Sequence, residues 1–438
     1  MTEIIQYILG FLLGDSVSTD VLNQIGYTNQ ADDYHQYKLV ILPSTFFNEE
    51  VYANEKSLPK LPLQIWEETP ILYGKPTVEM IEGTLVLHAD LVASTYFLIS
   101  RYEEMVRKGV RDVHGRFIGK ESLPYRAGFI DSPLVDEYGL LLRTKLRELG
   151  VDAPEPPQEI KKVYLTHDLD HLAHYRTIRG FIGGIFRGIR RPNEGKRAIR
   201  TFFTGITYDP WYTFPWIFDL NNSVKKMLGS DRCESVIFIR SGFGRRKEDK
   251  PTLYFQTPDF ITFKKLCRKK EVTIGLHASY AAGISPIRIP YEAKSLARIA
   301  KKKINYNRNH FLNSREPSDF HHLLMAGITD DFTMGYADVA GFRLGTCRAV
   351  KWIDPVSQEL TSLTLHPLTV MDGSLSDKRY MFLNAHDAYE YTVRLIDTVE
   401  KWNGELVLLW HNTAVTKDPK SYHRHLYGKL IEYLKTKE

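Results

Sequence analysis

The segment Lys162-Val-Tyr-Leu-Thr-His-Asp-Leu-Asp-His171 begins as a strand and ends in a cluster of ionisable residues. Its first half is apolar and aromatic, which predicts a buried strand over Lys162–His167. Its second half places Asp168 and Asp170 two residues apart, flanked by histidines. Two carboxylates this close repel each other unless a cation or a shared proton intervenes. The end of this strand is therefore a candidate site.

From this segment onward, predicted strands and helices alternate. Further strands are predicted over Ser235–Arg240, Val272–His277, Lys303–Tyr306 and Glu405–Trp410, and helices over Pro258–Lys270, Pro290–Lys302, Pro317–Ala326 and His386–Trp402. Proline lies at or near the first turn of several helices, and Gly327 and Gly404 follow two of the helix ends. Repeated strand–helix units predict a parallel sheet with helices outside, either a barrel or an open sheet.

Histidine or aspartate follows four of the predicted strands. They end at Asp168 and Asp170, at His277, at Asn307–His310 and at His411. In a β/α barrel the chemistry lies at the C-terminal ends of the strands. Each residue alone is typical of a structural or capping role. Four strands that bring imidazoles and carboxylates to one face indicate instead a mononuclear metal site with one open position.

The residues before this region have a different charge balance. Residues 1–158 carry 14 Lys and Arg against 23 Asp and Glu, a net charge of −9, whereas the remainder has a net charge of +14. Prolines cluster within Val151–Gln158 and cannot continue a helix or a central strand. We therefore predict an N-terminal α/β domain over 1–150, a linker over 151–160 and a second domain over 161–438.

The N-terminal part contains few candidate functional residues. Strands are predicted over Lys38–Leu42 and Thr84–His88, and helices between residues 90 and 108 and over Val135–Leu149. We find no nucleophile–base pair, glycine-rich phosphate loop or ligand cluster here. The polar segment Asp112–Phe117 is interpreted as a surface turn.

The composition of the 438 residues, 43% hydrophobic and 25% charged, is that of a folded globular protein and excludes disordered and collagen-like classes. The apolar segment Ile4–Leu13 is too short for a membrane span, which needs about 20 residues. It lacks the features of a secretory signal and predicts an amphipathic helix. Three isolated cysteines argue against a disulfide framework. We therefore expect a cytoplasmic location.

Residues 176–200 form a strongly basic segment, with eight Lys and Arg against the single acidic residue Glu194, interleaved with Ile and Phe. Such a segment is either a solvated insertion or an amphipathic element that contacts an anionic membrane surface. The functional interpretation is contact with a lipid-linked glycan or with an anionic sugar. No nucleic-acid-binding motif accompanies the charge, so no nucleic-acid partner is expected.

Four motifs in the second half resemble those of the polysaccharide deacetylases of the NodB-homology type (carbohydrate esterase family 4). Thr166-His-Asp-Leu-Asp170 resembles the first motif of that family, T-F-D-D, with one residue inserted between the carboxylates. The other three matching segments are Gly275–Ser279, Gly341–Gly345 and Leu408–Asn412. In the first half, Ala93–Glu104 and Arg126–Asp131 resemble an uncharacterised domain that accompanies such deacetylases in Bacteroidetes-like bacteria.

This resemblance implies a distorted (β/α) barrel and hydrolysis of an acetyl group, N-acetyl rather than O-acetyl, from a carbohydrate, such as an intermediate of surface-polysaccharide biosynthesis. A divalent metal, Zn²⁺ or else Co²⁺, Mn²⁺ or Ni²⁺, would polarise the carbonyl and lower the pKa of bound water. The implied metal ligands are Asp170, His277 and His310. The implied catalytic residues are Asp168 as base, His411 as acid and Arg343 as a cation beside Asp168.

Three aromatic residues are candidates for substrate binding. Tyr280, or a backbone N–H near it, would contact the oxyanion. Trp211, which otherwise belongs to a turn before a helix, and Trp410 would line the sugar site.

The sequence departs from the family at Ala281, where the second metal-binding histidine is expected. His310 is the candidate substitute, with His171 and His174 as competitors. Two further functions stay open: a non-catalytic glycan-binding or scaffold protein that has lost the metal, and an amidohydrolase that acts on a non-sugar amide.

Overall fold

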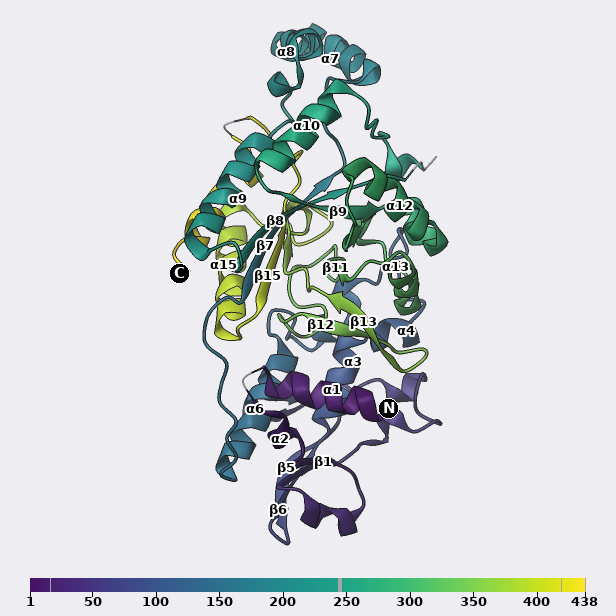
Figure 1. The fold of residues 1–438 in the computed structure, drawn as a ribbon, viewed down its shortest axis with the longest axis vertical. Coiled ribbons are helices and arrows are strands. Elements are labelled where there is room, and N and C mark those ends of the chain that lie inside the picture. Colours follow the sequence, from purple (N-terminus) through teal and green to yellow (C-terminus); the bar gives the residue numbers. More distant parts are fainter. Residues whose placement is uncertain (16, 243–245, 419, 438) are drawn as a thin grey trace.

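A computed structural model describes residues 1–15, 17–242, 246–418 and 420–437. Figure 1 shows an elongated molecule with a small sheet near the N-terminus at one end, a larger sheet in the middle, and the helices α7 and α8 at the opposite end. Within the described ranges, none of the helices has the length and apolar character that crossing a bilayer requires.

The N-terminal part contains a four-stranded sheet in the order β1-β2-β6-β5. Its strands are β1 Ile25–Tyr27, β2 Leu39–Ile41, β5 Gly74–Ile81 and β6 Thr84–Ala89, and β3 Gln64–Trp66 and β4 Thr69–Ile71 form a separate pair. The helices are α1 Thr2–Leu13, α2 Thr19–Leu22, α3 Leu91–Ile99, α4 Tyr102–Val106, α5 Leu123–Arg126 and α6 Leu134–Glu148. The amphipathic helix expected at the N-terminus is α1, which buries its apolar face.

The helix predicted between residues 90 and 108 is two helices. Arg101 separates α3 from α4 with a positive φ of 65°, a conformation that ends a helix. The buried Arg101 guanidinium donates to Glu104 and to Ser314 Oγ, 2.9 Å away in the second half of the chain. These contacts stabilise the interruption between α3 and α4. A local apolar pattern does not predict them, because Ser314 is far from Arg101 in the sequence.

The second part contains a nine-stranded sheet in the order β12-β13-β11-β10-β9-β8-β7-β15-β14, in which only the β12–β13 pair is antiparallel. The strands are β7 Lys162–Leu169, β8 Cys233–Ile239, β9 Thr273–Ala278, β10 Tyr306–Asn309, β11 Asp330–Asp331, β12 Val350–Asp354, β13 Glu359–Leu365, β14 Val370–Met371 and β15 Glu405–Leu409. The described chain between α6 and β7 contains no helix or strand. The division into domains remains a prediction.

Helices cover the outside of this sheet (Figure 1). Those labelled around it in Figure 1 are α9 Phe214–Leu228, α10 Pro258–Lys269, α12 Ile289–Ala300, α13 His321–Met325 and α15 Ala385–Lys401. The second part also contains α11 Tyr280–Ile284, α14 Asp372–Ser376 and α16 Tyr422–Leu434. The helices α7 Ile178–Arg190 and α8 Pro192–Thr204 lie apart from them. The central strands are continuous buried runs, as in β15, because a parallel sheet is covered on both faces.

One strand was misplaced by the sequence prediction. The strand expected over Lys303–Tyr306 is β10, which begins at Tyr306. Its residues Asn307, Arg308 and Asn309 are polar but buried. Their side chains are hydrogen-bonded inside the sheet, for example Asn307 Nδ2 to Asp331 Oδ1 at 2.7 Å. An apolar pattern cannot identify a strand of this kind.

The nine-stranded sheet is curled, consistent with an α/β barrel, and its two sides are linked by the segment that follows β13. Leu368 N–H donates to Met334 O beyond β11, and Thr369 N–H donates to Val407 O of β15. Buried His366 contacts Glu405 Oε2 at 2.6 Å and Asp330 Oδ1 at 3.0 Å. These bonds connect strands that are far apart in the strand order.

His366 predicts a fall of stability at alkaline pH. Burial alone would lower its pKa, but Glu405 and Asp330 outweigh burial and raise it to about 9. The unfolded value is about 6.5. The folded state therefore holds an extra proton between these values, so the stabilisation is full below about pH 6.5 and is lost as the pH rises to about 9.

Urea unfolding at several pH values should show the wild-type advantage over His366→Gln shrinking by roughly 3 kcal/mol across this range. His386→Gln, at a histidine exposed on α15, is the matched control and should run parallel to the wild type. An advantage of His366 that does not change with pH contradicts the prediction.

Buried Glu104 of α4 joins the N-terminal part to the segment between β11 and β12. Its carboxylate accepts from Arg101 at 2.6 Å and from Arg343 at 2.8 Å. Burial would raise the pKa of Glu104, but the two guanidinium groups lower it to about 2. The residue is therefore ionised and satisfies two buried cations.

Glu104→Ala leaves both arginines buried without their partner and should lower the free energy of unfolding by about 3–5 kcal/mol. Glu148→Ala removes an exposed partner of Lys145 and should change stability by at most about 1 kcal/mol. Chemical denaturation of both variants measures the difference. Equal effects would show that the Glu104 contacts do not stabilise the interface.

Candidate functional site

The C-terminal ends of β7, β9, β10 and β15 bring together most of the ionisable residues expected at the site. Asp168 belongs to β7, and Asp170 follows two residues later on the same face, because successive strand residues alternate between faces. β7, β8, β9 and β10 are consecutive parallel neighbours. This order carries His277 of β9 and His310, directly after β10, to the same edge as Asp170.

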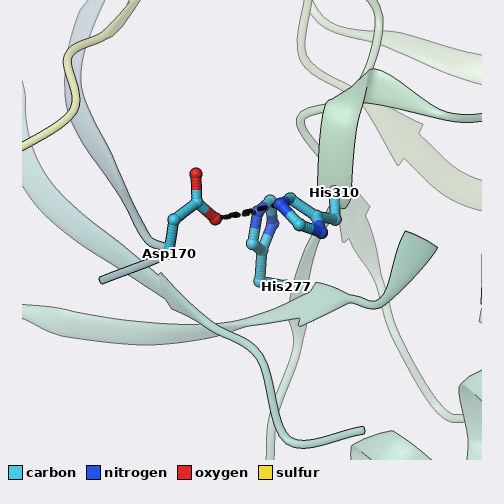
Figure 2. Close-up of side chains that lie close together, drawn as sticks. All are labelled: Asp170, His277 and His310. Atoms are coloured by element: carbon cyan, nitrogen blue, oxygen red, sulfur yellow. Dashed lines mark ion pairs between the residues drawn. The ribbon is translucent and has the colours of Figure 1, made fainter. Parts of the chain in front are cut away.

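Asp170, His277 and His310 offer one ligand atom each within 4.8 Å of one another (Figure 2). Asp170 Oδ1 lies 3.4 Å from His277 Nε2 and 3.1 Å from His310 Nε2. Burial would raise the pKa of Asp170, but the two imidazoles hold it well below its ordinary value. The three side chains therefore form a mixed carboxylate and imidazole donor set.

Two atoms of this cluster are buried without a hydrogen-bond partner, namely Asp170 Oδ1 and His277 Nε2. The other ring nitrogen of His277, Nδ1, lies 2.9 Å from Arg308 O, a carbonyl that can only accept. Nδ1 therefore donates to this carbonyl, and the ring is oriented with Nε2 toward Asp170. Buried polar atoms left open in this way fit a divalent cation with further open coordination positions.

His310 is held by a carboxylate behind it. Its Nδ1 lies 3.2 Å from Asp249 Oδ1, and Asp249 also accepts the backbone N–H groups of Tyr280 and Ala281. A carboxylate behind a ligand histidine is common in metal sites because it fixes the ring orientation. The backbone of Ala281 thus helps to hold Asp249, which orients His310, the candidate substitute for the histidine expected at position 281. His171 and His174 pack against Trp211 instead.

A buried arginine also lies beside the cluster. Arg240 Nη1 is 3.6 Å from Asp170 Oδ1 and 3.4 Å from the His310 ring nitrogens, and Nη2 donates to Pro251 O. Its guanidinium supplies one positive charge against the buried carboxylates. A metal ion would share this carboxylate with Arg240.

Asp168 lies next to the triad. Its Oδ1 is 3.3 Å from Arg308 Nη1, and its Oδ2 is 3.6 Å from His277 Nε2. Arg308 is fully buried, and its guanidinium lies 4.6 Å from the centre of the Phe238 ring. Arg308, which the sequence did not single out, therefore occupies the place expected for Arg343. The structure places Arg343 against Glu104 and Gly335 O.

His411 follows β15 and faces both aspartates. Its Nε2 lies 3.7 Å from Asp170 Oδ2 and 4.0 Å from Asp168 Oδ2, and its Nδ1 is 2.8 Å from Asp372 Oδ1. Burial would lower its pKa, but Asp372 above all raises it to about 10. His411 is therefore protonated at neutral pH. Asp372 was missed because it follows the two-residue strand β14, which has no recognisable pattern.

A pocket of about 200 Å³ opens onto these residues. It is lined by residues from both parts of the chain, namely Arg116, Asp168, Asp170, His310, Phe311, Leu312, Met371, Asp372, Gly373, Tyr380, Leu409 and His411. A larger groove of about 740 Å³ lies between α10 and α12, but the described residues that line it include no histidine or carboxylate. The smaller pocket is therefore the candidate site.

The segment expected to be a surface turn, Asp112–Phe117, contributes to the pocket. Arg116 is 7% exposed and binds Asp112 Oδ2 through Nε, Phe311 O through Nη1 and the Tyr380 hydroxyl through Nη2. The N-terminal part therefore supplies one residue that lines the pocket, Arg116, and this residue hydrogen-bonds two other lining residues, Phe311 and Tyr380. Tyr380 was also missed, since it lies in a loop without a motif.

The three aromatic candidates for substrate binding do not line this pocket in the described chain. Trp410 is fully buried and packs on Tyr427. Trp211 packs on His171 and His174. The hydroxyl of Tyr280 is 3.2 Å from His114 Nδ1. Trp410 follows a strand whose side chains alternate between faces, and its own ring lies on the face opposite to the pocket-lining Leu409 and His411.

The donor set predicts that the protein binds about one divalent ion per chain, which metal analysis after dialysis against Zn²⁺ would measure. Asp170→Asn, His277→Ala and His310→Ala should each abolish the binding, and Asp249→Asn should weaken it by about 10–100-fold. His386→Ala, at an exposed position on α15, is the control. Unchanged affinity in His310→Ala would exclude His310 as a ligand.

The N-terminal part of the chain is similar to a described protein family. A family model described as a family of unknown function (DUF7033) matches residues 2–151. No curated protein matches. Among solved structures, the chain is similar to one described as a "putative polysaccharide deacetylase from Mycobacterium smegmatis", with a TM-score of 0.38 and 11% identity over 64% of this chain and 86% of that chain. Similarity at this level decides neither fold nor activity.

Proposed function

We propose that the protein is a metal-dependent carbohydrate deacetylase built on a distorted (β/α) barrel of the polysaccharide deacetylase type. The observation that carries the proposal is the convergence of ligand atoms of Asp170, His277 and His310 beside a pocket, with Asp170 Oδ1 and His277 Nε2 buried and without a hydrogen-bond partner. Asp168 and His411 lie on either side of this triad. The resemblance of four sequence motifs to that family supports the same class of reaction.

Asp170, His277 and His310 would hold the ion. When bound, a divalent cation supplies Lewis acidity toward an acyl oxygen and acidifies a water molecule. The chain itself provides Asp168, paired with Arg308, to accept the proton of that water. A general base must lie within hydrogen-bond reach of this proton, and Asp168 is adjacent to His277 of the triad.

His411 is proposed to protonate the departing amine. Asp372 binds both the ring Nδ1 and the backbone N–H of His411, so the ring is fixed with Nε2 toward the two aspartates. A protonated imidazole in this position can donate a proton to a leaving nitrogen. Amides need this help because a neutral amine leaves far more readily than an amide anion, which favours an N-acetyl substrate.

The size of the pocket limits what can enter. A volume of about 200 Å³ accommodates an acetamido group with part of a sugar ring and leaves the remaining sugars outside. We propose an acetylated glycan or sugar intermediate of surface-polysaccharide biosynthesis as substrate. We also propose a cytoplasmic location, in keeping with three cysteines that are free and buried.

Arg240 favours a second candidate, a non-catalytic glycan-binding protein. Its guanidinium lies 3.6 Å from Asp170 and supplies a positive charge without a metal. In that case the pocket would bind a sugar and release no acetate.

Acetate release from a panel of N-acetylated sugars and oligosaccharides, followed with Zn²⁺ present, tests the proposed reaction. Asp168→Asn and His411→Ala should each lower kcat by about 10²–10⁴-fold, the usual contribution of a general base or acid. Asp168→Asn should still bind the metal, which separates loss of chemistry from loss of the site. His386→Ala should retain full activity.

The outcomes distinguish the two candidates. Sugar binding without acetate release, unaffected by chelators, would favour the glycan-binding protein. Acetate release that Asp168→Asn leaves intact would contradict the assigned role of Asp168.

A further inference from the structure

The helices α7 and α8 form a hairpin that projects from one end of the molecule (Figure 1). They pack against each other through small residues, with the Cα atoms of Gly188 and Gly195 facing one another and Gly184 against Ala198. The stacked rings of Phe181 and Phe202, 4.3 Å apart, extend this contact. The hairpin therefore has its own internal packing and leaves its outer surface free for another role.

One face of α7 is apolar and exposed to solvent. Ile178, Ile182, Ile185, Phe186 and Ile189 follow the spacing that places residues on one side of a helix, and the last two are 68% and 78% exposed. On α8, Ile199 and Phe203 are also exposed, Phe203 at 73%. Large apolar side chains gathered on one helix face of a protein mark an interaction site.

Basic residues flank this face. Arg179 and Arg190 of α7 and Lys196 and Arg197 of α8 are exposed. Arg187 and Arg191 form ion pairs with Glu194, the only acidic residue in either helix. The hairpin therefore combines an apolar face with a clear excess of positive charge.

The base of the hairpin is anchored to the body of the protein. Arg176 binds both carboxylate oxygens of Asp259 at the start of α10, at 2.7 and 3.0 Å. Asp209, which follows α8, accepts the backbone N–H groups of His174 and Tyr175. Both ends of the hairpin are thus tied down, and its exposed face is presented in a defined orientation.

We propose that this hairpin docks the protein on a membrane surface rich in anionic lipids. An amphipathic helix with Ile and Phe on one face and Arg and Lys beside it lies in the plane of the interface, with its apolar side chains among the acyl chains and its cations among the headgroups. α7 has 13 residues and is about 20 Å long, so it would lie on the bilayer. This inference does not depend on the proposed reaction.

Charge complementarity favours lipid over the other occupants. A second copy of the chain would present the same basic hairpin and bring like charges together. A nucleic acid would pair with the cations but leave the exposed Ile and Phe side chains in water. An anionic bilayer satisfies the cations and the apolar face together.

Co-sedimentation of the full chain with vesicles tests the proposal. Binding should be strong to phosphatidylglycerol–phosphatidylcholine vesicles, weak to pure phosphatidylcholine vesicles, and reduced by added NaCl. The variant Ile185→Ser, Phe186→Ser, Ile189→Ser should lower the apparent partition coefficient by at least about tenfold, because each side chain is worth more than 1 kcal/mol on burial. Arg190→Glu with Arg197→Glu should have a comparable effect.

Matched controls lie at the opposite end of the molecule. Val78→Ser with Met80→Ser removes exposed apolar side chains of β5, and Lys60→Glu with Lys75→Glu reverses two exposed charges of the N-terminal part. Both should bind vesicles as the wild type does, with thermal unfolding confirming that all variants are folded.

Equal binding to both kinds of vesicle would overturn the proposal, and so would equal losses in the control variants. Self-association that the triple serine variant abolishes, without anionic-lipid binding, would identify a second copy as the occupant and also overturn it.

Discussion

Two aspartates two residues apart, Asp168 buried at the end of β7 and Asp170 partly buried just after it, impose the main constraint on this protein. Removing a carboxylate from water costs several kcal/mol unless opposite charge and hydrogen bonds compensate. The guanidinium of Arg308 on β10 pairs with the Asp168 carboxylate, and the imidazoles of His277 and His310 lie beside the Asp170 carboxylate. These compensating groups come from other parallel strands of the same sheet. The strand order therefore supplies the positive and polar groups that burial of the two carboxylates requires.

The curl of the sheet extends this constraint to the far strands. His411 reaches the aspartates from β15, on the other side of β7, and is fixed by Asp372 after β14. At the opposite end of the strands, His366 ties Asp330 to Glu405. In both places an imidazole lies between carboxylates. His366 connects distant strands at one end of the sheet, and His411 lines the pocket at the other end.

Local sequence patterns predicted the strands that carry the metal-site candidates, because continuous apolar runs that end in His or Asp are visible without tertiary information. They also predicted His310 as the substitute for the residue missing at Ala281, since parallel strands end at one edge, and the structure places His310 beside Asp170 and His277. They misplaced β10, whose buried polar residues hide its strand character. The metal ligands themselves remain a prediction until binding is measured.

Local sequence patterns did not predict the residues whose position depends on contacts between distant parts of the chain. Arg308 of β10 is the cation at Asp168 although two strands, β8 and β9, lie between β10 and β7, whereas Arg343 contacts Glu104 in the N-terminal part. The hydrogen bonds of Arg116 to Phe311 and Tyr380 join segments about 200 or more residues apart. Only the assembled fold brings these groups together.

Because Arg116 belongs to the first part of the chain and two of its hydrogen-bond partners, Phe311 and Tyr380, belong to the second, the two parts cannot be recombined freely. A chimera that imports residues 2–151 from another protein must import a side chain able to reach the Phe311 carbonyl and the Tyr380 hydroxyl. Otherwise the mouth of the pocket changes shape while the buried triad below it stays intact. Substitutions in the first part would then change which molecules enter the pocket and leave the Asp170, His277 and His310 side chains unchanged.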